Sequence, residues 1–262
     1  MNELTLPLDR FKKFALTKVL ARQAGHIAWI ESDDPVTAIR SMAASVDGNH
    51  NNCAVWANAG DYQKEFRDEI QKWRKQYHYK FTGKICDTHT TGAIIPFLTT
   101  EFNAAANKPS KQLDCTGGRL HDFSSGINAL RDFTIQRTLH VQEALNPEFL
   151  IVRPRVNFTE RARNTSHLHT ERNKEGMRYR LIDAIYSPHT FIVDNSDVIF
   201  GEDGNFDVIE GPIAIYECPS NSLLMITRSD GKNTPAVHSE HFYLSPAENL
   251  ESRSILTCDV GF

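Results

Sequence analysis

The sequence predicts an α+β protein in which a mainly helical N-terminal part supports a C-terminal β-sandwich or jelly roll. Before residue 147, apolar residues recur mostly at helical spacing. After it, many short apolar runs follow one another at even spacing, with turn residues between them. We therefore expect a helical supporting region over residues 1–147 and a β core over residues 148–262, packed as one compact unit.

The N-terminal part is expected to hold three helices, each with an apolar stripe along one face. They are predicted over residues 8–23, 61–77 and 125–145. Asn146-Pro147 ends the third, because the residue before a proline avoids the helical backbone conformation. Two short apolar runs between the helices are predicted as strands, over residues 53–56 and 93–98.

The C-terminal part contains eight predicted strands, separated by turn residues such as Asn-Ser and Asp-Gly. They are predicted over residues 149–156, 166–171, 178–186, 190–194, 198–200, 213–217, 223–227 and 254–260.

Composition and charge exclude several classes of function. A formal net charge of −4 argues against a surface dedicated to nucleic acids or anionic membranes. No apolar run approaches the roughly 20 residues that span a bilayer, and the first residues do not resemble a signal peptide. The five cysteines form no CxxC pair, which is typical of reduced thiols. We expect a soluble cytoplasmic protein that acts on a small molecule; the sequence indicates no oligomeric state.

The segment Ser166–Glu171 contains residue types that bind transition metals. Residues two apart on a strand face the same side, so His167, His169 and Glu171 would project into one cavity if the segment is extended. His238 follows a loop that contains glycine and proline, and it would add another imidazole. Two histidines and one carboxylate, with open positions opposite them, are the ligands of non-haem Fe(II) oxygenases. The pattern therefore predicts a transition-metal site.

Two ligand sets fit this pattern. His169, Glu171 and His238 would form a carboxylate-bearing triad suited to Fe(II) and an oxidising co-substrate. His167, His169 and His238 would form a three-histidine site, as in cupin-type dioxygenases that need no co-substrate. A third hypothesis, from another class of function, is a non-catalytic β-sandwich module that binds a metal or another ligand. The residues alone leave all three open.

Arginines in the predicted strands are candidates for binding carboxylates. Arg253 opens the last apolar strand, where burial of its charge is costly unless an anion pairs with it. Its planar guanidinium suits a carboxylate bound through two hydrogen bonds. Arg153 and Arg155 alternate on a predicted strand and so face the same side, where they would bind an anionic substrate or form a solvated sheet face.

The order of these residues resembles that of the Fe(II)/2-oxoglutarate-dependent oxygenases with the double-stranded β-helix fold. The shared order is His169-x-Glu171, a long insert, His238, and then Arg253 about one strand later. The likeness covers roughly residues 149–262 and includes the strand 178–186 with the His189-Thr190-Phe191 turn after it.

Two further features qualify the resemblance. Ala54-Val55-Trp56, with the helix after it, is similar to an uncharacterised bacterial branch of the same superfamily. Glu171 departs from the family pattern, because most members carry an aspartate as the carboxylate ligand.

The resemblance implies a jelly-roll or cupin-like core and an oxidoreductase, an iron dioxygenase that uses 2-oxoglutarate and O₂. It implies that the metal ligands are His169, Glu171 and His238, with His167 as the alternative to Glu171. It implies that the distal carboxylate of 2-oxoglutarate binds Arg253, assisted by the hydroxyl of Thr190 or Tyr186. The expected reaction is an oxidation, such as hydroxylation, of a small polar or amino-acid-like substrate.

Overall fold

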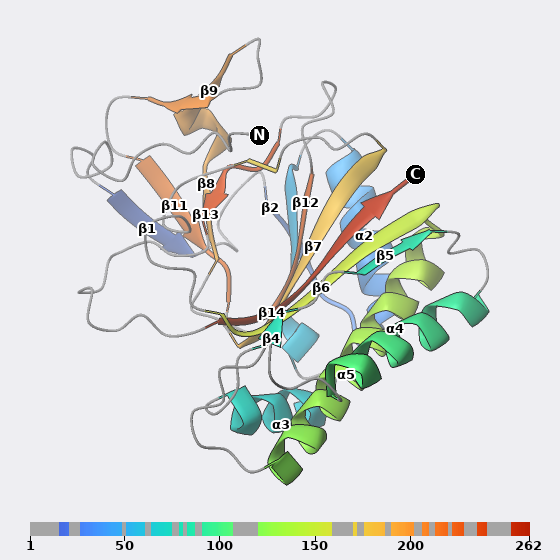
Figure 1. Ribbon diagram of the computed structural model, residues 1–262. Coiled ribbons are helices and arrows are strands. Elements are labelled where there is room, and N and C mark those ends of the chain that lie inside the picture. The colour runs from blue at the N-terminus through green and yellow to red at the C-terminus, as the bar shows by residue number, and fades with distance from the viewer. Residues whose placement is uncertain are drawn as a thin grey trace.

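Two β-sheets lie face to face, and helices cover the outer face of the larger one (Figure 1). This arrangement comes from a computed structural model, which gives the chain a mixed α+β fold. The structure describes residues 16–20, 27–48, 51–60, 64–74, 79–80, 83–86, 91–106, 120–158, 170–171, 176–186, 190–201, 206–209, 213–219, 222–227, 235–239 and 253–262.

The larger sheet has eight strands in the order β2-β3-β12-β7-β14-β6-β4, with β5 also paired to β6. Its strands are β2 (Ile27–Ile30), β3 (Cys53–Trp56), β4 (Tyr79–Lys80), β5 (Gly83–Cys86), β6 (Phe149–Phe158), β7 (Met177–Tyr186), β12 (Leu223–Thr227) and β14 (Arg253–Gly261). The pair β2 and β3 is parallel, whereas the other neighbours are antiparallel. Strands from both halves of the chain therefore share one sheet.

The smaller sheet has four strands in the order β1-β11-β8-β13. They are β1 (Leu16–Leu20), β8 (Phe191–Val193), β11 (Ile213–Glu217) and β13 (His238–Ser239). A separate antiparallel pair is formed by β9 (Val198–Phe200) and β10 (Phe206–Val208). After residue 148, the chain runs through β6 and β7 in the larger sheet and β8 and β11 in the smaller. It then crosses to β12, to β13 and back to β14, so consecutive segments alternate between the sheets.

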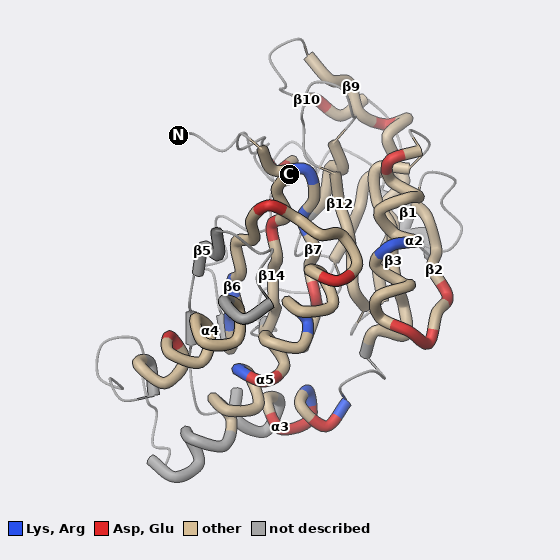
Figure 2. The backbone as a smooth tube through the Cα atoms, turned by 90° about the vertical axis from the view of Figure 1, so that its right-hand side faces the viewer, with Lys and Arg blue, Asp and Glu red and all other residues tan. Residues whose placement is uncertain are grey.

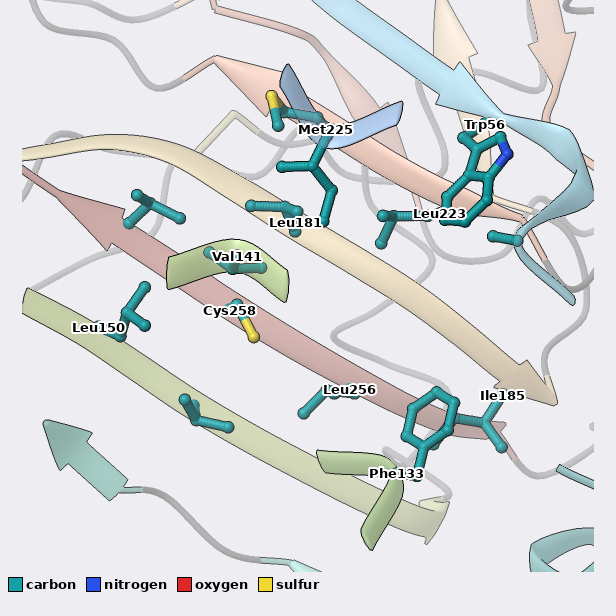
Figure 3. Packing of buried hydrophobic residues seen from close by; sticks show 14 of the residues in the cluster. Trp56, Phe133, Val141, Leu150, Leu181, Ile185, Leu223, Met225, Leu256 and Cys258 are labelled. Carbon is teal, nitrogen blue, oxygen red and sulfur yellow. The ribbon is translucent and has the colours of Figure 1, made fainter. Parts of the chain in front are cut away.

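Four helices are described: α2 (Pro35–Asp47), α3 (Lys64–Arg74), α4 (Thr91–Ala106) and α5 (Leu120–Leu145). Two short 3₁₀ turns, η2 (Ala57–Gly60) and η3 (Asn195–Asp197), complete the described elements. Figure 3 shows Phe133 and Val141 of α5 packed over apolar side chains of the larger sheet, among them Leu150, Leu181 and Leu256. Full burial of a side chain such as Phe133 contributes about 1.5–3 kcal/mol, so this layer is a main source of stability. None of the described helices is both long and apolar enough to cross a membrane.

A second apolar layer fills the space between the two sheets. Ile182 and Leu224 of the larger sheet pack there with Ile192 and Tyr216 of the smaller sheet. Residues of β7 alternate between the two layers: Tyr179 and Leu181 belong to the helix side, and Ile182 to the inner side. By the same alternation, Arg180 faces the smaller sheet.

A buried ion cluster joins the helices to the outer face of the larger sheet. Asp183 of β7 receives Arg67 Nη2 on Oδ1 at 2.5 Å and Arg137 Nε on Oδ2 at 2.6 Å. The two guanidinium groups also lie over the rings of Phe133 and Trp56, respectively. All three charged side chains are at most 4% exposed, so Asp183 balances one of two buried positive charges.

Three cysteines in the described residues are buried and free of disulfides: Cys53, Cys218 and Cys258. Burial raises the pKa of the Cys218 and Cys258 thiols to about 12, and the pKa of Cys53 also lies well above its ordinary value. These thiols are therefore neutral apolar fillers of the core.

The structure confirms most of the predicted elements. Seven of the eight predicted C-terminal strands are present, as are the strand at Cys53–Trp56 and two of the helices, α3 and α5. Of the predicted strand 166–171, only Thr170 and Glu171 are described, and neither lies in a strand.

Two predictions in the N-terminal part were wrong. Residues 93–98 lie in helix α4, because Ile94, Leu98 and Phe102 repeat every four residues and all three are buried in the helix-side core. Leu16–Leu20 were predicted as helical but form β1, which pairs in parallel with β11. The remaining residues of that predicted helix, 8–15 and 21–23, lie outside the described residues.

Helix α2 and strand β2 were not predicted. Yet α2 has clear sequence signals, because Asp34 caps it and Pro35 occupies its first turn. The Asp34 side chain accepts a hydrogen bond from the backbone N–H of Thr37 at 2.7 Å. This bond lowers the pKa of Asp34, and Gly48 ends the helix.

Candidate metal centre

Glu171 and His238 come together between the two sheets. His238 opens β13, where it pairs with Ile192 of β8, and its side chain is 1% exposed. Glu171 precedes β7, and its side chain is 12% exposed. The Oε1 atom of Glu171 lies 3.9 Å from Nε2 of His238. Two of the predicted metal ligands therefore lie close together in a protected position.

The His238 ring is oriented by its own backbone. Its Nδ1 lies 3.2 Å from the carbonyl oxygen of Ala236. A proton on Nδ1 would be donated to that carbonyl, which leaves the lone pair on Nε2, the nitrogen nearer Glu171. A histidine that binds a metal commonly donates its other ring N–H to a backbone carbonyl in this way.

The spacing of Glu171 and His238 fits a shared metal ion. Oxygen and nitrogen ligands lie about 2.0–2.2 Å from a metal of this kind, so two ligands of one ion are at most about 4.2 Å apart. The 3.9 Å between Glu171 Oε1 and His238 Nε2 is within this limit. An imidazole and a carboxylate are also the donor types that suit Fe(II).

A chain of alternating charges leads away from Glu171. Arg180 of β7 donates from Nη1 to Glu171 Oε1. Its Nε donates to Oδ1 of Asp259 at 2.6 Å, and its Nη2 to Oδ2 at 3.2 Å. Asp259, on β14, is 0% exposed and also accepts a hydrogen bond from Arg153 of β6. Figure 2 shows basic and acidic positions interrupting the mostly uncharged strands β6, β7 and β14.

The two predicted substrate arginines lie next to this chain of charges. Arg153 is 9% exposed, and its guanidinium pairs with Asp259. Arg155 is half-buried and lies two residues further along β6, opposite Ile255 of β14. Arg153 and Arg155 are therefore in alternate positions of one strand, as predicted, and their role in substrate binding stays a prediction.

The predicted co-substrate residues lie at strand ends. The backbone of Arg253 pairs with Phe158 at the start of β14, and that of Tyr186 pairs with Ser254; the side chains of Arg253 and Tyr186 lie outside the described residues. Thr190 is buried just before β8, and its carbonyl accepts a hydrogen bond from the Cys218 N–H at 2.8 Å. The assignment of these three residues to 2-oxoglutarate stays a prediction.

His167 and His169 lie outside the described residues, so the choice between the two ligand sets is not tested. Within the described ranges, no group of three or more histidine, cysteine, aspartate or glutamate side chains is placed to hold a metal. Sequence reasoning did not identify Arg180 and Asp259 as part of the site. Their signal was a charged residue inside an otherwise apolar strand, in Arg180-Leu181-Ile182 and in Cys258-Asp259-Val260.

Comparison with known proteins gave distant structural likenesses only. No family model matches the chain, and no curated protein does. Among solved structures, the dioxygenase for auxin oxidation 1 of Arabidopsis thaliana, in complex with 2-oxoglutarate, aligns at a TM-score of 0.40 and 11% identity, covering 90% of this chain and 92% of that chain.

Two other solved structures align at the same TM-score of 0.40. The Kdo hydroxylase KdoO, described as a non-heme Fe(II) alphaketoglutarate dependent dioxygenase, is 9% identical and aligns over 94% of this chain and 88% of its own. A full-length protein of Neurospora crassa in complex with alpha-KG is 7% identical, over 90% and 84%. The descriptions of the Arabidopsis and Kdo enzymes name the class of enzyme that the sequence resembles; at this level of likeness, the functional assignment depends on the residues of the site.

Proposed function

We propose that this protein is a cytoplasmic, non-haem Fe(II)- and 2-oxoglutarate-dependent oxygenase that hydroxylates a small polar or amino-acid-like substrate. The observation that carries the proposal is the protected approach of Glu171 Oε1 to His238 Nε2, 3.9 Å apart. The Ala236 carbonyl and Arg180 hold these two side chains in place.

The strand arrangement supports a double-stranded β-helix core over residues 148–262. Its strands alternate between two facing sheets, and an apolar layer fills the space between them. Jelly rolls are built from two such antiparallel sheets. The N-terminal helices, together with β1 to β5, extend and cover this core.

Each residue has a separate task in the proposed enzyme. His169, Glu171 and His238 would hold the metal, and Fe(II) would supply the activation of O₂. Arg253 would bind the distal carboxylate of 2-oxoglutarate through its planar fork, with the hydroxyl of Thr190 or Tyr186 assisting. The apolar layer between the sheets would exclude water from the reaction.

One observation favours the three-histidine dioxygenase as a second candidate. Glu171 already accepts a charge-assisted hydrogen bond from Arg180, and a carboxylate held in this way has a role without a metal. His167, His169 and His238 would then be the ligands. In that enzyme, the metal site would need no 2-oxoglutarate.

An anaerobic titration of Fe(II)-loaded protein with 2-oxoglutarate tests the proposal. We expect a visible charge-transfer band that saturates, with an affinity for 2-oxoglutarate that is weaker by about tenfold or more in Arg253→Ala, because a charge-assisted bidentate pair is lost. Arg178→Ala, which removes an exposed arginine paired with Asp47, is the control and should titrate like the wild type. Tight iron binding without a band would favour the three-histidine enzyme, and absence of iron binding would favour the non-catalytic module.

A further inference from the structure

We infer that Arg180 is a positioning residue that fixes the Glu171 carboxylate for the metal, and that Asp259 orients Arg180 for this task. The inference rests on the proposed function and adds two residues to the proposed site. Neither belongs to the ligand sets that the sequence predicts.

The guanidinium of Arg180 divides its donors between two carboxylates. Nε and Nη2 donate to Oδ1 and Oδ2 of Asp259, at 2.6 and 3.2 Å, while Nη1 donates to Glu171. Because the guanidinium is planar and rigid, the bidentate pair with Asp259 fixes the direction in which Nη1 points. The position of the Glu171 oxygen is therefore set by Asp259 through Arg180.

Asp259 is itself held firmly. It lies directly opposite Arg180 in the antiparallel pairing of β14 and β7, and it is 0% exposed. Arg153 of β6 donates to its Oδ2 from the other side. The chain Arg153, Asp259, Arg180 and Glu171 thus alternates in sign, and its formal charges sum to zero. This neutrality allows four ionisable side chains to be mostly buried together.

Glu171 needs this support because it lies in no strand or helix. The other ligand, His238, belongs to the smaller sheet, whereas Arg180 and Asp259 belong to the larger sheet. Arg180 therefore transfers the regular geometry of β7 and β14 to a carboxylate whose own backbone is irregular. A lysine would keep the charge but has no fork, so it would not hold Asp259 and Glu171 in a fixed relation.

The test uses Co(II) as a spectroscopic substitute for the iron in the full-length protein. Wild type, Arg180→Lys and the matched control Arg178→Lys are titrated with Co(II), and the dissociation constant and visible ligand-field spectrum are recorded. Arg178 lies two residues away on the same strand, in an exposed ion pair with Asp47. We expect Arg180→Lys to weaken Co(II) binding about 10- to 100-fold and to alter the spectrum, as loss of a residue that orients a ligand does. Arg178→Lys should match the wild type.

The outcomes separate this inference from the proposed function. Wild-type protein that binds no Co(II) would overturn both. A wild type that binds Co(II), with an Arg180→Lys variant of equal affinity and spectrum, would overturn the inference alone, even if the variant melts at a lower temperature. If Arg180→Lys does not fold, Asp259→Asn takes its place. It removes the carboxylate that orients Arg180, and unchanged Co(II) binding in this variant would count equally against the inference.

Discussion

Glu171 Oε1 and His238 Nε2 lie 3.9 Å apart, although one residue precedes the larger sheet's β7 and the other opens β13 of the smaller sheet. The two sheets thus each bring one candidate ligand to a common point. This relationship makes the ligand set testable, because the competing sets differ only in whether Glu171 or His167 binds the metal.

Alanine variants of the four candidate ligands should separate the two ligand sets. After anaerobic reconstitution, we expect Glu171→Ala, His169→Ala and His238→Ala to lose affinity for iron by about tenfold or more, because each removes a donor atom. His167→Ala should retain about one iron per chain, as wild type does. The measurement is iron content after gel filtration, and the reverse result for Glu171 and His167 would identify the three-histidine site.

The β core was predictable because its signals are local. Strands such as Leu223–Thr227 are short apolar runs bounded by turn residues. The N-terminal elements were harder to predict. The run Ile94–Leu98 has the length and β-branched content of a strand, and only the further repeat to Phe102 indicates the helix. Strand β1 depends on pairing with β11, almost two hundred residues further along the chain, which no local pattern reports.

The site was predictable as residue types but not as a network. Histidines and a carboxylate in one motif suggested metal ligands, and Glu171 and His238 do lie together. The partners of Glu171 were not apparent, because Arg180 meets Asp259 only through the register of β7 and β14. A charge inside an apolar strand indicates that a partner exists, but the partner's identity depends on the three-dimensional fold.

Asp183→Asn should destabilise the fold strongly. The substitution leaves Arg67 and Arg137 buried with no carboxylate between them, and such a loss costs about 3–5 kcal/mol. The control is Asp68→Asn, which breaks the exposed pair with Lys64 and should cost less than about 1 kcal/mol. Urea denaturation gives both free energies of unfolding. Equal, small losses in the two variants would contradict the importance of the buried cluster.

Gly261→Ala should destabilise the end of β14. A Cβ at this position would overlap the ring of Phe149, the residue paired with Gly261 across the sheet. Overpacking of this kind costs about 1–3 kcal/mol. Gly48→Ala is the matched control, because its φ is −70° and its Cβ would have no atom nearer than 3.5 Å. We expect this control to be neutral or slightly stabilising in thermal denaturation, and a Gly261→Ala protein that melts with wild type would show that the ring moves freely.

His140, on α5, should make stability fall as the pH falls. Burial lowers its pKa to about 4 from 6.5, and Arg137 lowers it further, against the opposite effects of Asp34 and Asp183. The unfolded chain therefore binds a proton near pH 6.5, before the folded protein does, so its contribution is complete above 6.5 and is lost as the pH falls toward 4. Because the side chain is only half-buried, the loss should be on the order of 1 kcal/mol.

His140→Gln isolates this effect, since glutamine does not titrate. Free energies of unfolding in urea, measured at a pH above 6.5 and again near 4, should decrease less in the variant than in wild type. The difference between the two decreases is the contribution of His140, because all other titrating groups are common to both proteins. Identical decreases would show that His140 takes up a proton in the folded protein as readily as in the unfolded chain.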